Sequence, residues 1–335
     1  MSLRAAIVGL GRIGSRFDEE PGRKAVWSHA GAYLACADRF LLAGAAEPDA
    51  GNAAAFRRRC PDVPVFASAE RLFAEIAPEV VSICTPVEQH AAALHAALGL
   101  PGLKAIWCEK PLAGTLGDAE VMVAACAARG VPLIVSHVRR WLPLWRRVAE
   151  RIEAGDVGTP VTIRIAMPNR LFSIGSHAVD LALMLGGEAV AVSALPLPAL
   201  EEEGEPAVAA LLGLASGAYA VIQVTGRKHA LIIEAEVIGT EGRLFAREDE
   251  GRILLDRFAD SPRYAGYREL RPEARERMPS FDDASPFVEI AREIARLAAD
   301  PSLRPSCDGA AALAVQRVLA RLADAASDAV PAKLI

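Results

Sequence analysis

Short apolar runs alternate with helix-like patterns over the first 137 residues. We expect strands at residues 5–8, 40–46, 65–66, 80–84, 105–108 and 133–136. Between them the apolar positions repeat with helical spacing, and we expect helices at 28–38, 49–60, 87–98 and 115–130. Apolar strands separated by helices are typical of a parallel sheet covered on both faces. The pattern therefore predicts a doubly wound α/β domain over residues 1–137.

The pattern changes after residue 137. Helices are expected at 143–154 and 173–185, with a strand at 161–167 between them. Apolar runs then follow one another without helices, at 189–194, 207–214, 218–225, 231–239, 243–246 and 253–258, with a solvated turn at 201–204. Such a series predicts an antiparallel sheet. Residues 268–283 are charged and are expected to be irregular, and helices at 285–299 and 307–326 end the chain.

We therefore expect a second domain of the α+β class over residues 138–335, with an open, mainly antiparallel sheet and with C-terminal helices able to pack back on the first domain. The segments 207–214 and 218–224 are too apolar for a hairpin that faces solvent. Because only two helices remain to cover this sheet, we expect one of its faces to contact a second subunit. The predicted assembly is a homodimer or homotetramer.

Composition and charge exclude several classes of protein. The chain has 335 residues, 52% of them hydrophobic, and a net charge of −5. No basic stripe is present, so we expect no nucleic-acid partner. The segment 206–226 carries no charge and has the length of a membrane span. Ser216 and Gly217 divide it into two halves rich in β-formers, which favours a hairpin and no membrane contact.

The six cysteines are scattered and form no C-x-x-C pair. This usage is typical of a reducing compartment, and we expect neither a disulfide framework nor a metal site. The apolar segment at the N-terminus is too short for a signal peptide. These features predict a cytoplasmic protein.

The first strand is followed by a G-x-G-x-x-G motif, in which the glycines are Gly9, Gly11 and Gly14. Gly9 permits a tight turn, Gly11 lets the backbone approach a pyrophosphate, and Gly14 allows close packing of helix on strand. Free N–H groups at the following helix N-terminus favour phosphate binding. We therefore expect Gly9 to Gly14, including Arg12 and Ile13, to bind a dinucleotide. Residues 16–27 are polar and look like an insertion in this crossover.

Glu47 follows the second strand, where an acid accepts hydrogen bonds from the adenosine ribose. It comes later than the usual ~20 residues after the glycine motif, and the insertion explains much of the delay. Glu47 should repel a 2′-phosphate, and Arg57 to Arg59 lie at the far end of the next helix. We therefore predict NAD in preference to NADP. The alternative is an ordinary loop acid.

The strand at 105–108 ends in Glu109, Lys110 and Pro111. The carboxyl edge of a parallel sheet is where ligands bind, so Lys110 is expected at the mouth of a cleft. Pro111 disfavours helical geometry at Lys110 and keeps it extended. The alternative is a solvated ion pair at the end of a strand.

Ser173, His177 and Asp180 have spacings of four and three residues, which would place them on one face of the helix expected at 173–185. Polar side chains on an otherwise apolar helix need partners. One interpretation is a catalytic histidine, and the other is a buried histidine with Asp180 as its acceptor. We interpret His29 as a surface or capping residue, with a position at the cleft as the alternative.

Taken together, these motifs resemble the glucose–fructose oxidoreductase and inositol dehydrogenase family (Gfo/Idh/MocA). The resemblance covers nearly the whole chain, and its carriers are Gly9 to Gly14, Thr85-Pro86 with His90, Glu109-Lys110-Pro111, Arg139-Arg140 with Pro143, and Gly175 to Asp180. It implies an N-terminal Rossmann domain and a C-terminal α+β domain whose sheet often forms subunit interfaces. It also implies oxidation or reduction of sugars, cyclitols and related polyols with NAD or NADP.

The resemblance assigns roles to particular residues. Lys110 and His177 match the catalytic lysine and histidine, and Asp180 is the candidate acceptor that orients His177. Cofactor contacts are expected at Thr85, Pro86, His90, Glu109 and Lys110, and substrate contacts at Arg140, Ser173 and His177. In the expected reaction, His177 takes the hydroxyl proton while Lys110 stabilises the developing alkoxide.

Two features depart from the family pattern. Ser173 stands where an Asp usually precedes the histidine by four residues, and only residues 168–172 replace a glycine-rich substrate loop. We therefore expect an altered pocket. Two alternatives follow: a non-catalytic dinucleotide-binding sensor or regulator on the same fold, and an NAD-dependent lyase or glycosidase that returns the hydride within one cycle.

Overall fold

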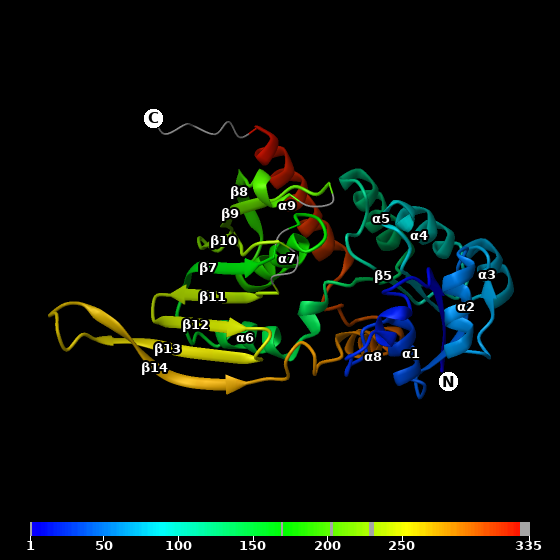
Figure 1. Cartoon of the computed structure of the whole chain (residues 1–335), viewed down its shortest axis with the longest axis horizontal. Helices are drawn as coiled ribbons and strands as arrows, with labels where there is room; N and C mark the ends of the chain where they lie inside the picture. The colour runs from blue at the N-terminus through cyan, green and yellow to red at the C-terminus, as the bar shows by residue number, and fades with distance from the viewer. Residues whose placement is uncertain (1, 169, 202–203, 228–230, 329–335) are drawn as a thin grey trace. The chain divides into compact units, whose positions relative to one another are not determined.

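The computed structural model describes residues 2–168, 170–201, 204–227 and 231–328 (Figure 1). Asn169, Glu202 and Glu203, which fall in the expected substrate loop and solvated turn, lie outside these residues. The chain divides into two compact units. Unit 1 comprises residues 1–141 and 282–313, and unit 2 comprises residues 142–281 and 314–335. Each unit has its own sheet.

The sheet of unit 1 has six parallel strands in the order β3-β2-β1-β4-β5-β6. The strands are β1 (Leu3–Val8), β2 (Phe40–Ala46), β3 (Val65–Phe66), β4 (Val80–Ile83), β5 (Ala105–Cys108) and β6 (Leu133–Val135). This confirms the doubly wound parallel sheet. The strand order reverses between β1 and β4, and ligands bind at the carboxyl edge beside such a reversal.

Helices surround this sheet, and most of them begin at a capping side chain. They are α1 (His29–Ala35), α2 (Ala50–Arg59), α3 (Ala69–Ile76), α4 (His90–Leu98), α5 (Leu116–Arg129) and α8 (Pro286–Ala299). The side chains of Ser28, Asp49, Ser68 and Thr115 accept hydrogen bonds from backbone N–H groups in the first turns of α1, α2, α3 and α5. Replacing such a cap by Ala typically costs about 1 kcal/mol. α8 lies beside α1 (Figure 1).

The first crossover contains the expected insertion at residues 16–27, and its helix begins after the expected cap Ser28, so no α-helix begins directly after the glycine motif. Residues 11–15 form a single turn, the chain then leaves through the 3₁₀ turn η1 (Arg16–Glu19), and α1 begins only at His29. The N–H of His29 donates to the carbonyl of Ile13 at 3.2 Å, and that of Ala30 donates to the carbonyl of Gly14 at 3.0 Å. The insertion therefore separates the turn at the glycine motif from α1, and these two hydrogen bonds hold the start of α1 against that turn.

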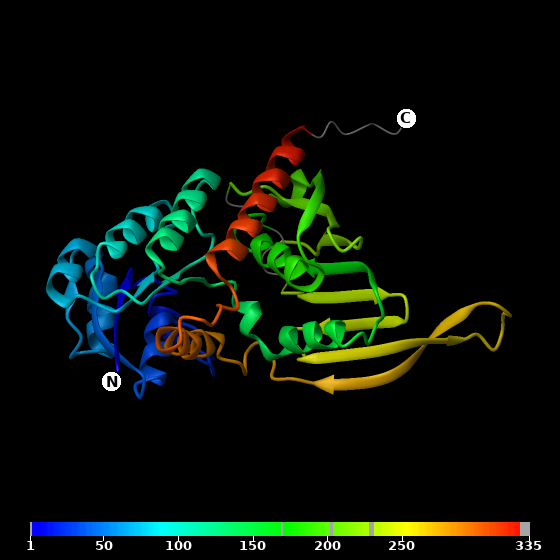
Figure 2. The same ribbon diagram turned by 180° about the vertical axis from the view of Figure 1, so that it is seen from behind.

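Unit 2 contains an open sheet in the order β14-β13-β12-β11-β7-β10-β9-β8. Its strands are β7 (Pro160–Met167), β8 (Ala189–Pro196), β9 (Val208–Leu214), β10 (Tyr219–Val224), β11 (Glu234–Gly239), β12 (Gly242–Arg247), β13 (Arg252–Asp260) and β14 (Arg268–Arg277). Among these described strands, only β7 and β10 pair in parallel, which confirms a mainly antiparallel sheet. α6 (Pro143–Glu153) and α7 (Gly175–Gly186) cover one face (Figure 2).

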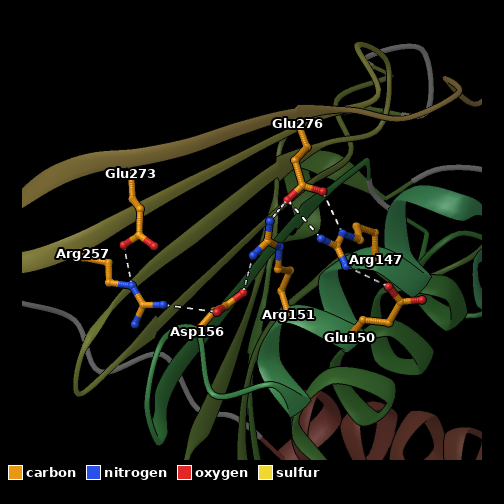
Figure 3. A network of polar contacts seen from close by, with 7 residues as sticks. All are labelled: Arg147, Glu150, Arg151, Asp156, Arg257, Glu273 and Glu276. Atoms are coloured by element: carbon orange, nitrogen blue, oxygen red, sulfur yellow. Dashed lines mark hydrogen bonds and ion pairs between the residues drawn. The ribbon is translucent and has the colours of Figure 1, made fainter.

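The prediction of an irregular segment at 268–283 is wrong for its first ten residues, which form the edge strand β14. Its high charge obscured the strand. The charges have partners within unit 2, however, and charged residues are common on edge strands because they discourage pairing with other chains. Arg147 of α6 donates to Glu276 of β14 at 2.7 Å, and Arg151 contacts the same carboxylate (Figure 3). Asp156 links Arg151 to Arg257 of β13 at 2.7 and 3.2 Å.

Two helices depart from their expected limits. α7 begins at Gly175, and residues 171–174 form turns before it. Helical spacing therefore does not place Ser173 on the same face as His177. α9 (Gly309–Asp328) begins in unit 1 and continues into unit 2. Within the described residues, no helix combines the length and the apolar character that a membrane crossing requires.

Candidate functional site

A cavity of about 670 Å³ opens at the carboxyl edge of the unit 1 sheet. The loops after β1, β2 and β4 line it, which is the position that the strand order predicts. Five residues expected to bind a dinucleotide meet there: Gly9, Gly11, Glu47, Thr85 and Pro86. The cavity lies wholly within unit 1.

The glycines have distinct structural roles in this wall. Gly9 has φ +93°, and a Cβ there would lie 2.7 Å from the carbonyl carbon of Cys84. A Cβ at Gly14 would overlap the carbonyl oxygen of Gly9. Gly11 has open space at its Cβ position and lines the cavity. Gly9 and Gly14 are therefore required by packing, whereas Gly11 exposes backbone to a ligand.

Glu47 is a fixed carboxylate in the cavity wall. It is 9% exposed, and its two oxygens accept from the N–H of Leu10 at 2.7 Å and that of Asp49 at 2.9 Å. It thus ties the glycine turn to the start of α2. Glu70 also lines the cavity, so two acids face the ligand space. Arg16 donates to Asn52, another lining residue, at 3.1 Å.

Arg12, a predicted cofactor contact, is engaged by the insertion. Its Nε donates to Glu20 at 2.6 Å, and its guanidinium lies 4.2 Å from the centre of the Phe17 ring. The side chain is 70% exposed and does not line the cavity. Ile13 is half-buried and also lies outside the lining.

His90 supports the cavity wall from behind. It is buried, and its ring nitrogens lie 3.0 Å from the carbonyl oxygen of Thr85 and 3.2 Å from that of Leu112. The histidine therefore connects the loop after β4 to the segment after Pro111.

The end of β5 carries the second part of the site. Glu109 is buried, whereas the next residue, Lys110, is half-exposed. One oxygen of Glu109 lies 3.0 Å from Nε2 of His29. The alternative of a solvated ion pair is therefore wrong for Glu109.

His29 is fully buried, so its interpretation as a surface residue is wrong. Burial lowers its pKa, although the hydrogen bond and charge of Glu109 act in the opposite direction. For Glu109, burial would raise the pKa, but hydrogen bonds from His29 and Ser136 and the Lys110 charge lower it below its ordinary value. The pair is therefore best described as a neutral imidazole that donates to a carboxylate.

The family-like segment of unit 2 lies on α7 and on the turns before it. His177 is half-buried and Asp180 is buried, both on α7, while Ser173 precedes the helix. Arg140, with Lys110, belongs to unit 1, and its guanidinium donates to the carbonyl of Ser306 at 3.1 Å. The expected catalytic and substrate residues are thus divided between the two units.

Glu205 shapes the turn before α7 and was missed from the sequence. One of its oxygens accepts from the N–H groups of Phe172 and Ser173 at 3.0 and 2.9 Å, and the other accepts from Arg170 at 3.0 Å. Arg170 has φ +140°, which is unusual for a residue other than glycine. No local signal pointed to Glu205, because these partners are more than thirty positions away.

Comparison with known proteins decides the family. The model of an oxidoreductase family with an NAD-binding Rossmann fold matches residues 3–137, and the Gfo/Idh/MocA C-terminal domain model matches residues 145–245. The chain belongs to the Gfo/Idh/MocA family. Its first unit accordingly contains the family's NAD-binding Rossmann domain, and the resemblance drawn from the motifs is confirmed.

Individual relatives differ in what they do. The chain is 33% identical to D-apiose dehydrogenase of Paraburkholderia graminis over 43% of this chain and 41% of that protein. It is 26% identical to scyllo-inositol 2-dehydrogenase (NAD⁺) of Bacillus subtilis over 72% of this chain and 73% of that protein. It also shares its fold with Gal80p of Saccharomyces cerevisiae, solved as a super-repressor mutant (TM-score 0.78, 16% identity, 98% and 96% of the two chains). The chain spans about half the length of the first curated relatives that it matches.

Proposed function

We propose that this protein is an NAD-dependent oxidoreductase that acts on the CH–OH group of a sugar, cyclitol or related polyol. The observation that carries this proposal lies in unit 1, where a cavity with a glycine wall and a fixed Glu47 accompanies a buried Glu109 and the half-exposed Lys110. The matched sugar and cyclitol dehydrogenases support the substrate class.

The residues present fit a dinucleotide. The open space at Gly11 accommodates a pyrophosphate against the backbone, and the carboxylate of Glu47 has lone pairs left for ribose hydroxyls. When bound, NAD supplies the hydride acceptor. Glu47 and Glu70 oppose a 2′-phosphate through like charge, so we propose NAD in preference to NADP.

Two side chains perform the proton and charge chemistry in this proposal. His177 takes the proton of the substrate hydroxyl, with Asp180 as the acceptor that orients it. The Lys110 ammonium stabilises the developing alkoxide. Ser173 and Arg140 contact the substrate. Ser173 has no charge, so it does not replace the orienting carboxylate that the family usually supplies at this position.

A non-catalytic regulator is the second candidate, and the fold shared with Gal80p is the specific observation that favours it. Assays of turnover discriminate between the two. NAD is mixed with D-apiose, scyllo-inositol, myo-inositol and other polyols, and NADH formation is followed by absorbance. Turnover of any of them supports the enzyme. NAD binding without turnover, together with NAD-dependent binding of a protein partner, supports the regulator. A lyase or glycosidase would consume substrate without net NADH.

We also propose that a second copy covers the outer face of the unit 2 sheet. Leu195 of β8, Leu211 of β9 and Tyr219 of β10 are 60%, 46% and 43% exposed, respectively. Apolar patches of this kind often mark subunit interfaces. A monomeric mass by light scattering at micromolar concentration would reject the proposed dimer or tetramer.

The six cysteines are buried free thiols, which is consistent with a cytoplasmic location.

A further inference from the structure

A series of hydrogen-bonded, buried polar side chains lies in unit 1 behind the end of β5. The Tyr33 hydroxyl lies 2.8 Å from Oγ of Ser82, and this Oγ lies 2.9 Å from Nδ1 of His29. Nε2 of His29 lies 3.0 Å from Glu109. From the other side, Ser136 hydrogen-bonds to Glu109 and accepts from the indole N–H of Trp107 at 2.8 Å. The two branches meet at one carboxylate.

With a neutral imidazole at His29, the chemistry of the groups gives one direction for each bond. A carboxylate only accepts, so His29 donates through Nε2. A neutral imidazole carries one N–H, so Nδ1 accepts from Ser82 and the hydroxyl of Tyr33 in turn donates to Ser82. This series of hydrogen bonds therefore ends on Glu109. All of its bonds form together when His29 is neutral and Glu109 is ionised.

The surroundings keep water away from this series of side chains. The rings of His29 and Trp107 lie with centres 3.7 Å apart and are tilted by 34°, and the rings of His29 and Phe287 of α8 form an edge-to-face pair with centres 5.3 Å apart. Among the described residues, the titratable groups that act on Glu109 include His29 of α1, Cys108 of β5, Cys84 after β4 and Lys110. Burial raises the pKa of both thiols well above their ordinary value, so they stay uncharged. Lys110 supplies positive charge beside Glu109.

We propose that His29 is a positioning residue for Lys110. Its neutral imidazole holds Glu109 as a buried anion, and Glu109 in turn provides a fixed counter-charge for the Lys110 ammonium. The backbone of Glu109 is fixed as well, because its N–H donates to the carbonyl of Ile83 on β4 at 3.0 Å. The consequence for catalysis rests on the proposed function, whereas the hydrogen-bond arrangement does not depend on it.

His90 shows why His29 is more than a core histidine that has found partners. Both ring nitrogens of His90 face backbone carbonyls, which are present whatever the side chains are, and the Cys108 thiol also lies 3.6 Å from Nδ1. Those of His29 face two side chains, Ser82 and Glu109, and Glu109 precedes the one lysine that the family pattern places in the reaction. A histidine that served packing alone would not require an ionised acceptor directly before that lysine.

The first test concerns the hydrogen-bond arrangement and requires no substrate. ¹⁵N spectra of histidine-labelled protein, assigned with His29→Gln, report the protonation and tautomer of each ring. Because the pKa of His29 lies below its ordinary value, we expect a neutral imidazole with the proton on Nε2 at pH 7 and above. An imidazolium, or a proton on Nδ1, would overturn the proposal.

The second test measures the effect on Lys110. Reductive methylation with ¹³C-formaldehyde gives the Lys110 amine an NMR signal, assigned with Lys110→Met, whose titration midpoint can be followed in each variant. We expect this midpoint to fall in His29→Leu, which lacks the donor to Glu109, and to stay near the native value in His29→Gln, whose amide can donate to Glu109. Equal midpoints in Leu and Gln variants would overturn the proposal, and the comparison is valid whether or not a substrate is found.

The third test uses the reaction, once turnover is established. His29→Leu should lower kcat on the order of tenfold, the effect of losing one hydrogen bond to a charged group, with the Kd for NAD unchanged. His29→Gln should restore most of kcat. Equal losses in the two variants would show a structural role only. If the Leu variant does not fold, the histidine spectra of the native protein and the lysine titration in His29→Gln and Glu109→Gln decide the question. An unchanged midpoint in Glu109→Gln rejects the proposal.

Discussion

Glu109 in unit 1 and Glu276 in unit 2 both have a pKa below their ordinary value, but the causes differ. Glu109 is buried, which opposes its charge, and it is held by hydrogen bonds from an imidazole and a serine together with the positive charge of the neighbouring Lys110. Glu276 lies at the edge of a sheet and is lowered chiefly by the hydrogen bond from Arg147, with Arg151 on its other side (Figure 3).

The difference is in what each carboxylate depends on. A buried charge is tolerated only while its donors are in place, because water cannot replace them. A half-exposed charge can exchange a protein partner for solvent, so exposed ion pairs contribute little to stability. The Glu109 cluster is therefore expected to be sensitive to single substitutions, and the Glu276 network to be tolerant of them.

The largest effect is expected at Lys110, next to the buried cluster, and at His177. If both act on one reacting carbon, Lys110→Met and His177→Ala should each abolish turnover while the Kd for NAD stays within a few-fold. Lys110→Met removes the charge that stabilises the alkoxide, and His177→Ala removes the base. Steady-state rates and fluorescence titration with NAD measure the two quantities. Ser173→Ala is the control and should be much milder. A variant of Lys110 or His177 with nearly native kcat would reject its role.

The next effect is one of stability. Glu109→Gln keeps the shape of the side chain but removes the charge that His29 and Ser136 donate to. A hydrogen bond to a charged group contributes about 1.5–3 kcal/mol and one to a neutral group about 0.5–1.5 kcal/mol. Because the Gln carbonyl can still accept, two bonds are weakened rather than lost, and we expect a loss of roughly 2–3 kcal/mol in the free energy of unfolding. Denaturant unfolding measures it. A loss below about 0.5 kcal/mol would show that Glu109 is not an ionised acceptor in the core.

Glu47 is intermediate between Glu109 and Glu276 in how strongly the fold is expected to depend on its charge. It is nearly buried, but backbone N–H groups hold it, so a substitution changes ligand choice more than the fold. Glu47→Ser should weaken NAD binding and narrow the preference over NADP by about tenfold, equivalent to about 1.4 kcal/mol. Arg16, which donates to Asn52 at the cavity, can then attract a 2′-phosphate without opposition from the Glu47 charge. Fluorescence titration of both cofactors, with Glu47→Ser/Arg16→Met as the control, tests this. Tighter NADP than NAD binding by the native protein would reject the assignment.

Signals that lie close together in the sequence predicted much of this molecule. The apolar runs placed the parallel strands, and Pro111 with the preceding run placed Lys110 at a strand end. The glycine motif predicted the wall of the cavity, because each glycine answers a local backbone requirement.

The features that the sequence did not reveal depend on distant partners. His29 follows a polar insertion and therefore looked exposed, yet its partners Ser82 and Glu109 are 53 and 80 positions away. The highly charged segment that forms β14 was expected to be irregular, because the partners of its charges lie on α6 and β13. Glu205 is similarly linked to a turn 32 and 33 positions earlier.

The smallest effect is expected for Glu276→Gln, the same chemical change as Glu109→Gln in the exposed network. Its loss in the free energy of unfolding should be below about 1 kcal/mol, because solvent and the remaining carboxylates take over the two arginines. The pKa of Glu276 is lower in the folded protein than its ordinary value of 4.5. The stabilisation by the Glu276 charge is therefore present above about pH 4.5 and is lost as the pH falls through the pKa of the folded protein.

Salt should reduce this stabilisation further, since the Debye length shrinks from about 10 Å at 0.1 M to about 3 Å at 1 M. Denaturant unfolding of native and variant protein at both salt concentrations measures the difference, with Glu109→Gln as the salt-insensitive reference. If Glu276→Gln were as costly as Glu109→Gln and equally indifferent to salt, the α6–β14 network would be an essential part of the fold, and the contrast between the two carboxylates would be lost.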